Sequence, residues 1–249
     1  MSDHERKTPK PSEPMGWQDL IEDLVGVNLR GLRTLAAAFT QPAKLFASAR
    51  ARDWDGGVYS PSVRVYIFLV AVLVFFQFIW ADTSSPSVEI LRQRMAELAE
   101  IDPRLGEPFF LERVMNLFVL VFPIAALFCT FLGSLVMRVW GAGTPLLARI
   151  RLYFAAVLPS TLLQLFGTVG MSFLPITTAA FGVWLVLLVY WTADAITTYR
   201  GLSQVHTRRG RVWRSILLGT FNALIIMLAS IVTGTIAMNW EIERILAAP

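Results

Sequence analysis

Residues 65–81 read VYIFLVAVLVFFQFIWA, a run in which no side chain is charged. A bilayer core of about 30 Å is crossed by roughly 20 apolar residues of helix, because each residue advances the helix by about 1.5 Å. Four further apolar runs of comparable length follow it, at residues 115–139, 152–174, 176–196 and 216–240. The sequence therefore predicts an all-α, polytopic membrane protein whose transmembrane domain is a five-helix bundle.

The composition of the chain favours the same class. Of its 249 residues, 55% are hydrophobic and only 16% are charged, and the mean hydropathy is +0.56. A soluble domain usually carries about 25% charged residues. The single cysteine excludes a disulfide framework and a cysteine zinc site, and the two histidines exclude a histidine-rich metal site. We therefore expect no cofactor and no metal.

The chain divides by composition into three regions. Residues 1–16 are polar and proline-rich and lack the apolar core of a secretory signal, so they are predicted to form a disordered cytoplasmic tail. Residues 17–63 are predicted to be a cytoplasmic segment of interfacial amphipathic helices. Residues 64–249 contain the five spans, with an extracytoplasmic helical loop predicted at residues 82–113.

The amphipathic prediction rests on the spacing of apolar side chains within residues 17–39. These recur at helical intervals and face away from the charged side chains: Trp17, Leu20, Ile21, Leu24, Leu32 and Leu35. Pro42 then breaks the helix and can start a second one, in which Lys44, Arg50 and Arg52 are expected to face phosphates. Such a segment is either a docking or lipid-sensing platform or a simple anchor, and we favour the anchor.

The distribution of Lys and Arg predicts the orientation. With five crossings, seventeen of these residues lie on one side of the membrane and five on the other. The positive-inside rule then places the N-terminus and the loop 197–214 in the cytoplasm and the C-terminus outside. The expected counter-charge is anionic lipid headgroups and not nucleic acid. Four tryptophans are expected at the interfaces and one, at mid-span, between helices: Trp80, Trp140, Trp213 and Trp240, and Trp184 respectively.

Asp194 is the single acidic residue within a predicted span. Ionisable groups in a membrane are costly, so they pair with another group or line a path. A proton or cation path needs a second carboxylate or a histidine deeper in the bundle, and the spans contain neither. We therefore expect a structural role for Asp194 near the cytoplasmic end of the fourth span, either in an ion pair with Arg138 or Arg200 or in hydrogen bonds with nearby threonines.

The amides of Gln164 and Asn222 also lie within spans, where such groups more often join helices than bind substrate. Small residues, among them Gly219 and Gly234, predict close helix packing. The sequence contains no Gly-rich phosphate loop, paired-carboxylate motif, nucleophile elbow or metal-ligand spacing, so an enzyme is not expected. The candidate intramembrane polar site therefore comprises Asp194, Thr192, Gln164, Asn222, Arg138 and Arg200.

A family resemblance appears at the start of the first span. Gly57-Val-Tyr-Ser-Pro-Ser-Val-Arg64-Val-Tyr-Ile-Phe-Leu, with Gln41-Pro42-Ala-Lys44 before it and Pro123-Ile-Ala-Ala after it, resembles a pattern in uncharacterised bacterial inner-membrane proteins similar to the Yip1-like family. The resemblance implies five spans, a cytoplasmic N-terminus and a membrane-organising or interaction role without catalysis. Members of that family often begin with a zinc-ribbon-like cysteine cluster. This chain has none, so the resemblance implies no metal site.

The sequence thus predicts a non-catalytic integral protein of a bacterial inner membrane. It is expected to act through membrane lipids, other membrane proteins or copies of itself, as a membrane organiser or an accessory subunit. The alternative is a small transporter or permease component with a polar path near Asp194. A polar cavity at mid-membrane depth would favour transport, and a bundle packed shut would favour interaction.

Overall fold

The structure, a computed structural model, describes residues 29–51, 54–80, 96–97, 100, 108–171, 176–204 and 206–247. Within these ranges every regular element is a helix, which confirms the all-α prediction. Three short helices precede five long ones: α2 (Leu29–Thr40), α3 (Pro42–Ala51), α4 (Trp54–Gly57), α5 (Ser62–Trp80), α7 (Pro108–Val136), α8 (Leu146–Met171), α9 (Ile176–Gly201) and α10 (Arg208–Ala247). A 3₁₀ turn, η2 (Leu202–Gln204), lies between α9 and α10.

The helices run beyond the apolar segments that predict them. α10 has 40 residues, which corresponds to about 60 Å, or twice the hydrocarbon thickness of a bilayer. α9 begins at the predicted residue but continues past residue 196 to Gly201. Hydropathy detects only the part of a helix that is apolar, and a helix continues where its ends become polar. α7 and α8 also pass through Pro123 and Pro159 without ending.

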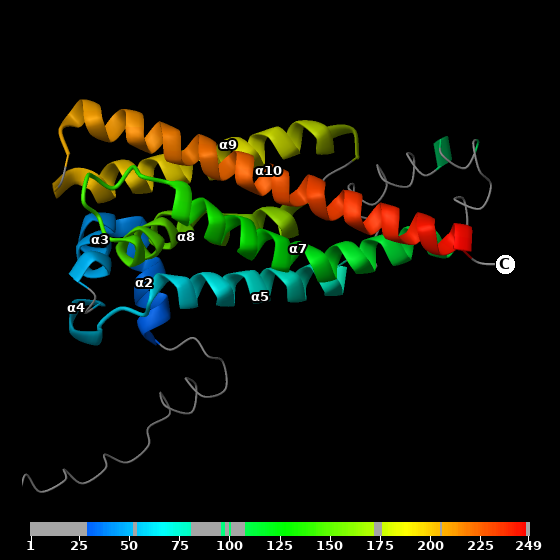
Figure 1. Ribbon diagram of the computed structural model, residues 1–249, viewed down its shortest axis with the longest axis horizontal. Coiled ribbons are helices and arrows are strands. Elements are labelled where there is room, and N and C mark those ends of the chain that lie inside the picture. The colour runs from blue at the N-terminus through cyan, green and yellow to red at the C-terminus, as the bar shows by residue number, and fades with distance from the viewer. Residues whose placement is uncertain are drawn as a thin grey trace, which may run out of the picture.

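α8 is the central helix of the bundle. It packs against α5, α9 and α3, and every residue from 152 to 161 is buried. α10 packs along α7 and α9. The long helices lie side by side, and successive ones run in opposite directions (Figure 1). α8 is less hydropathic than α7 or α10 because it faces protein and not the outer surface.

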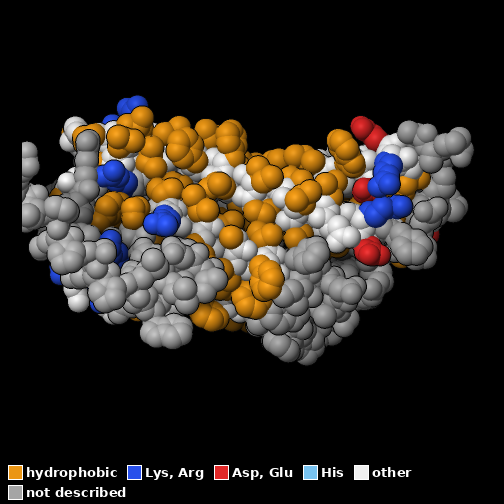
Figure 2. Space-filling model, turned by 90° about the horizontal axis from the view of Figure 1, so that it is seen from below, with side chains coloured by type: hydrophobic (Ala, Val, Ile, Leu, Met, Phe, Trp, Pro, Cys, Tyr) orange, Lys and Arg blue, Asp and Glu red, His pale blue; other side chains and the backbone are white. Residues whose placement is uncertain are grey.

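The outer surface over the middle of the molecule is apolar. Figure 2 shows hydrophobic side chains across this region, with Lys and Arg at one end and mixed charges at the other. Large apolar side chains point outward from α7, α9 and α10, including Leu120, Ile124, Phe128, Phe181, Leu188, Leu228 and Ile231. Water-soluble proteins rarely expose so continuous an apolar surface. Among the residues that the structure describes, three helical segments are long and apolar enough to cross a membrane: Glu112–Val136, Leu146–Gly167 and Arg208–Ile245.

Two tryptophans lie where the sequence does not predict them. Trp184 is 68% exposed on the outer face of α9 and does not pack between helices. Trp140 is fully buried, with its ring 5.7 Å from that of Phe46 in α3, and is no interfacial anchor. Hydropathy alone does not say which face of a helix is turned inward, or that α3 covers the turn after α7.

The short helices cover one end of the bundle, which we call the basic end. It consists of the described residues within 29–64, 137–151 and 196–215. These are α2–α4 with the start of α5, the turn after α7 with the start of α8, and the end of α9 with η2 and the start of α10 (left in Figure 1). In α2 the Thr34 hydroxyl accepts a hydrogen bond from the backbone N–H of Ser60 at 2.8 Å. At the start of α5 the Ser62 hydroxyl donates to the carbonyl of Arg151 in α8, also at 2.8 Å. α2 and α5 are therefore fixed to the rest of the bundle.

The structure describes only part of the N-terminal region and of the predicted loop, and it differs there from several predictions. Residues 1–28 and most of the predicted loop at 82–113 lie outside the described residues. α2 begins at Leu29 and buries Leu35 against the bundle, whereas Leu32 of the predicted stripe is exposed. In α3, Arg50 was expected to face phosphates, but its Nη2 donates to the carbonyl of Trp140 at 3.1 Å. That arginine therefore holds α3 against the turn after α7.

Candidate functional site

Each of the five long helices contributes at least one buried polar side chain, and one from each lies in a group at the middle of the bundle. We call this set the polar layer: Tyr66 (α5), Thr130 (α7), Tyr153 (α8), Asp194 (α9) and Asn222 (α10). All five are buried, and Asp194 is only 1% exposed. A buried polar group without a hydrogen bond is costly, so the bonds within the layer decide what it can do.

Asp194 is joined to α8 and α10 through a chain of neutral groups. The amide nitrogen of Asn222 donates to Oδ2 of Asp194 at 2.6 Å. The hydroxyl of Tyr153 donates to the amide oxygen of Asn222 at 3.1 Å. Asn222 thus uses both ends of its side chain to connect three helices, which is the role expected of an amide within a membrane bundle.

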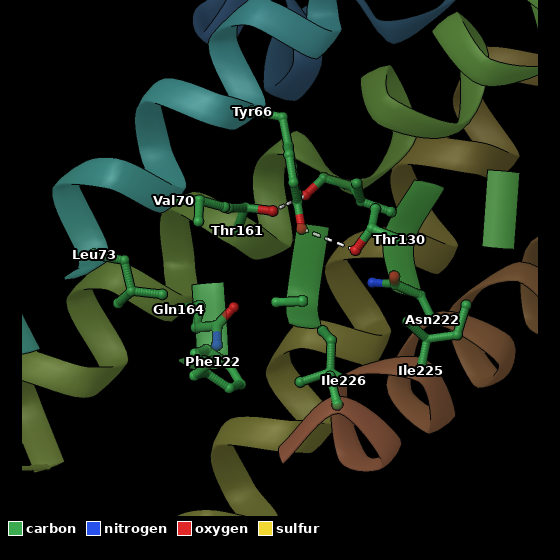
Figure 3. Close-up of a pocket in the computed structure, with 13 residues that line it drawn as sticks. Tyr66, Val70, Leu73, Phe122, Thr130, Thr161, Gln164, Asn222, Ile225 and Ile226 are labelled. Atoms are coloured by element: carbon green, nitrogen blue, oxygen red, sulfur yellow. Dashed lines mark hydrogen bonds between the residues drawn. The ribbon is translucent and has the colours of Figure 1, made fainter. Parts of the chain in front are cut away.

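The other half of the layer joins α5 to α7. The hydroxyls of Tyr66 and Thr130 are 2.9 Å apart and share a hydrogen bond (Figure 3). The ring of Tyr66 also lies edge-on to Phe154 of α8, with ring centroids 4.9 Å apart. A buried tyrosine usually finds a partner for its hydroxyl in this way, while its ring packs as an apolar group.

A small cavity lies beside the polar layer. Tyr66, Thr130 and Asn222 line it together with Thr161 and Gln164 of α8, and apolar side chains form the rest of its wall (Figure 3). The space that the centre of a water molecule can occupy is about 20 Å³. That is room for about one water molecule. The hydroxyl of Thr161 is bonded to the carbonyl of Val157 in its own helix.

Two oxygen atoms near the layer have no partner among the described residues. These are Oδ1 of Asp194 and the hydroxyl of Thr198, one turn later in α9. Ser160 of α8 also lies beside the carboxylate, although its hydroxyl donates to the carbonyl of Val157 at 2.9 Å. Within the described ranges, no three His, Cys, Asp or Glu side chains are grouped as metal ligands would be.

The structure brings together only part of the predicted site. Asn222 bonds to Asp194, and Gln164 lines the adjacent cavity. The hydroxyl of Thr192 donates to the carbonyl of Leu188 in its own helix, so it takes no part in the layer.

The predicted ion pair with Arg138 or Arg200 is wrong. Arg200 donates to the carbonyls of Phe39 and Thr40, both at 2.8 Å. Arg138 is exposed, and no arginine of the described chain forms a salt bridge with Asp194. The reason is geometric, since α9 extends almost two turns beyond the carboxylate and carries Arg200 to the basic end.

Three members of the layer are absent from the site predicted from the sequence: Tyr66, Thr130 and Tyr153. That site contains amides, charged side chains and Thr192, while the tyrosines count as part of the apolar runs. A usable signal was present, because a tyrosine in the middle of an apolar run must place its hydroxyl against a partner. Which partner it finds depends on the packing of helices far apart in the sequence.

At the basic end, arginines bind the carbonyl groups of the turn after α7. Nη1 of Arg214 in α10 donates to the carbonyl of Val139 at 2.7 Å. The same nitrogen is 2.7 Å from Nε2 of His206, and since arginine only donates, that histidine nitrogen accepts. Burial, and then the positive charge of Arg214, lowers the pKa of His206 below its ordinary value. The neutral form of His206 therefore helps to hold Arg214 against this turn.

Comparison with known proteins found no match to the chain, neither among family models nor among curated proteins nor among solved structures. The fold and the site thus define its class: an all-helical protein with helices able to cross a membrane and a hydrogen-bonded polar layer inside the bundle.

Proposed function

We propose that this chain is a five-span protein of a bacterial inner membrane, without catalysis, that acts by binding membrane lipids or other membrane proteins. The observation that carries this proposal is the buried polar layer together with the small size of the cavity beside it. Its hydrogen bonds run between helices, and the adjacent cavity holds about one water molecule. A layer of this kind holds a bundle together and offers no route through it.

The lengths and packing of α5 and α9 support five spans. α5 has 19 apolar-rich residues, or about 28 Å of helix, and α9 has 26, or about 39 Å. Both pack against the central α8 and run alongside the three helices that are long and apolar enough to cross. A helix of that length and direction, placed beside spanning neighbours, shares their depth in the bilayer.

The orientation follows from the charge at the basic end. Its segments carry most of the Lys and Arg of the described chain, so the positive-inside rule places this end in the cytoplasm. The opposite end carries the C-terminal part of α10, where Glu241 pairs with Arg113 at 3.3 Å and with Arg244 at 3.7 Å. On this assignment, the N-terminus is cytoplasmic, the C-terminus is extracytoplasmic, and anionic headgroups meet the basic end.

An interaction role without catalysis is also what the resemblance to Yip1-like membrane proteins implies. The N-terminal region supports it, because α2 and α3 form a platform on the basic end with Leu29, Leu32 and Phe39 exposed. Exposed apolar side chains beside basic ones suit a surface that contacts lipid or a protein partner.

A transporter with a path near Asp194 is the second candidate. One observation favours it: Oδ1 of Asp194 and the hydroxyl of Thr198 are buried without a partner among the described residues. A path needs continuous water access, however, and the cavity beside the layer admits about one water molecule.

Cysteine accessibility distinguishes the two functions. In a Cys129→Ala background, Gln164→Cys places a thiol at the cavity wall and Ser203→Cys places one on the exposed basic end. In native membranes opened on both sides, we expect a small charged thiol reagent to label the variant at Ser203 and not the one at Gln164. Both should react after denaturation in detergent. Rapid labelling at Gln164 in the native protein would establish a water-filled path and favour the transporter.

A further inference from the structure

An open cleft lies on the basic end, between α3, α9, η2 and α10. Its volume is about 480 Å³. Three of the described side chains that line it are cations, Lys44, Arg200 and Arg211, and none is acidic. Ser203 and Gln204 of η2 add exposed polar groups at its wall.

The fold holds the side chains of Arg200 and Arg211 in place. The guanidinium of Arg200 is fixed by its two hydrogen bonds to the last carbonyls of α2. The guanidinium of Arg211 lies over the ring of Tyr199, 4.7 Å from its centroid, and its Nε is buried without a partner among the described residues. Arginines fixed in this way lose little further freedom when they bind a ligand.

Few acidic residues lie near the cleft in the sequence. Residues 29–51, 137–151 and 196–215 form most of the basic end and contain no Asp or Glu, although Asp53 and Asp55 follow the first of these segments. The like charges of Arg200 and Arg211 beside one cleft repel one another, and a bound anion reduces that repulsion. Arginine matches phosphate well, because its planar fork can donate two parallel hydrogen bonds.

The position of the cleft indicates where the phosphate comes from. Arg211 is followed by the exposed side chains of Val212 and Trp213 and, about one turn later, of Ile216. The cleft therefore lies at the border between the apolar outer surface and the basic end. Exposed tryptophan at such a border marks the headgroup level of a bilayer.

From this arrangement we propose that the cleft binds the phosphate group of an anionic membrane lipid. The inference rests on the proposed placement of the chain in a membrane with its basic end at the cytoplasmic surface. The lipid's acyl chains extend along the apolar face of α10, and Arg211 contacts the phosphate. A soluble phosphate compound shares the headgroup chemistry but lacks the acyl chains.

Ligand-dependent stabilisation of the full-length protein tests the proposal. A ligand that binds the folded state raises the unfolding temperature, and the rise grows with the logarithm of the ligand concentration relative to its Kd. Purified protein in mixed micelles is heated with added phosphatidylglycerol, with phosphatidylcholine, or with glycerol phosphate or inorganic phosphate alone. We expect the anionic lipid to raise the unfolding temperature more than the zwitterionic lipid, and expect neither soluble phosphate to reproduce the rise.

Matched variants locate the effect. Arg211→Gln removes one charge from the cleft, and Arg209→Gln removes one from an exposed neighbour outside it. Ser203→Asp adds a negative charge to the cleft wall without removing a cation, and Thr207→Asp adds one outside the cleft at a helix start that accepts aspartate. We expect Arg211→Gln and Ser203→Asp to need about tenfold more anionic lipid for the same rise. The two controls should respond like the wild type.

Two results would overturn the proposal. Equal responses of all four variants would mean that the lipid acts through general surface charge and not through the cleft. A full response to glycerol phosphate or inorganic phosphate would assign the cleft to a soluble phosphate compound. A separate experiment tests the proposed orientation in the membrane. If a thiol introduced at Ser203 is labelled from outside the cell, the orientation is wrong, whatever the response to lipid.

Discussion

At the scale of single residues, Asp194 is the side chain on which the interpretation of the bundle depends most. It is buried, and its bonded partner is the amide of Asn222, not an arginine. A carboxyl group bonded to an amide that is itself bonded to Tyr153 is part of a helix-joining network. Its contribution is therefore to fix the relative positions of α8, α9 and α10.

Substitution of Asp194 tests this structural role. Asp194→Asn retains an oxygen that can accept from Asn222, so we expect the free energy of unfolding to fall by less than about 1 kcal/mol. Asp194→Leu leaves the Asn222 amide buried without its acceptor and should cost about 1–3 kcal/mol. Thr192→Val is the matched control in the same helix, because its hydroxyl bonds only within α9. Thermal unfolding in detergent provides the measurement.

Proton-coupled transport makes a different prediction for the same variants. It requires Asp194→Asn to remove activity while the protein remains folded. Flux into liposomes that is present in the wild type and lost in Asp194→Asn would contradict the structural account. An Asp194→Asn variant as unstable as Asp194→Leu would also contradict it, since the hydrogen bond would then not be what matters.

His206 gives the basic end a pH dependence. Its Nε2 accepts from Arg214, and burial together with the charge of that arginine lowers its pKa. The unfolded chain therefore takes up a proton, near the ordinary pKa of about 6.5, before the folded chain does. The stability that depends on neutral His206 is present above that pH and is lost as the pH falls below it.

The expected result is a decline in unfolding temperature as the pH is lowered from about 7.5 to about 5.5. His206→Gln keeps a side-chain oxygen that can accept from Arg214 but does not titrate, so its decline should be shallower. The difference between the two proteins isolates this group from the titration of the carboxylates. Identical curves would mean that the histidine does not couple protonation to folding.

The candidate site shows which side chains can be foreseen from the sequence. An amide or a carboxylate in an apolar run is conspicuous, so Asn222, Gln164 and Asp194 were predicted. The partner of each could not be, because helix rotation decides which side chains meet. Arg200 is close to Asp194 in sequence but binds the end of α2, while Tyr153 is far from Asn222 in sequence and reaches it.

At the scale of elements, the sequence predicts close helix packing at Gly219 and Gly234, and two helices approach closely at only one of these positions. A Cβ atom added to Gly219 of α10 would lie 3.0 Å from the backbone oxygen of Trp191 in α9. A Cβ atom added to Gly234, further along α10, would meet no atom within 4 Å. The small residue is therefore required at the first position and not at the second.

Alanine at these two positions should have opposite effects. Gly234→Ala places a better helix former in open space and should leave stability unchanged or raise it by up to about 1 kcal/mol. Gly219→Ala forces α9 and α10 apart and should lower the unfolding temperature. Thermal unfolding of both variants in the same detergent is the measurement. A Gly219→Ala protein as stable as Gly234→Ala would mean that the two helices do not approach as closely as described.

The helices themselves were predictable because each apolar run is long and unbroken. Their ends were not, since α10 gains about eight residues before its predicted start and α9 runs to Gly201. The covering of the basic end by α2 and α3 was also not predictable. It depends on contacts such as Phe46 with Trp140, which link segments about 90 residues apart.

At the scale of the whole molecule, the charge and the apolar surface are arranged along one axis. The basic end, the apolar middle and the mixed charges around Glu241 follow one another along the bundle (Figure 2). The layers of a membrane follow in the same order: anionic headgroups suit the basic end, hydrocarbon suits the apolar middle, and the opposite surface suits the mixed charges. The proposed orientation follows from matching the two.

The most direct test of this account is the side of the membrane on which each turn lies. In a Cys129→Ala background, Ser87→Cys and Ser203→Cys each introduce a single thiol, and an impermeant thiol reagent is applied to cells whose outer membrane alone is permeabilised. Five spans with the basic end in the cytoplasm predict labelling of the variant at Ser87 and protection of the variant at Ser203 until the inner membrane is opened. Labelling at Ser203 with protection at Ser87 would contradict the account.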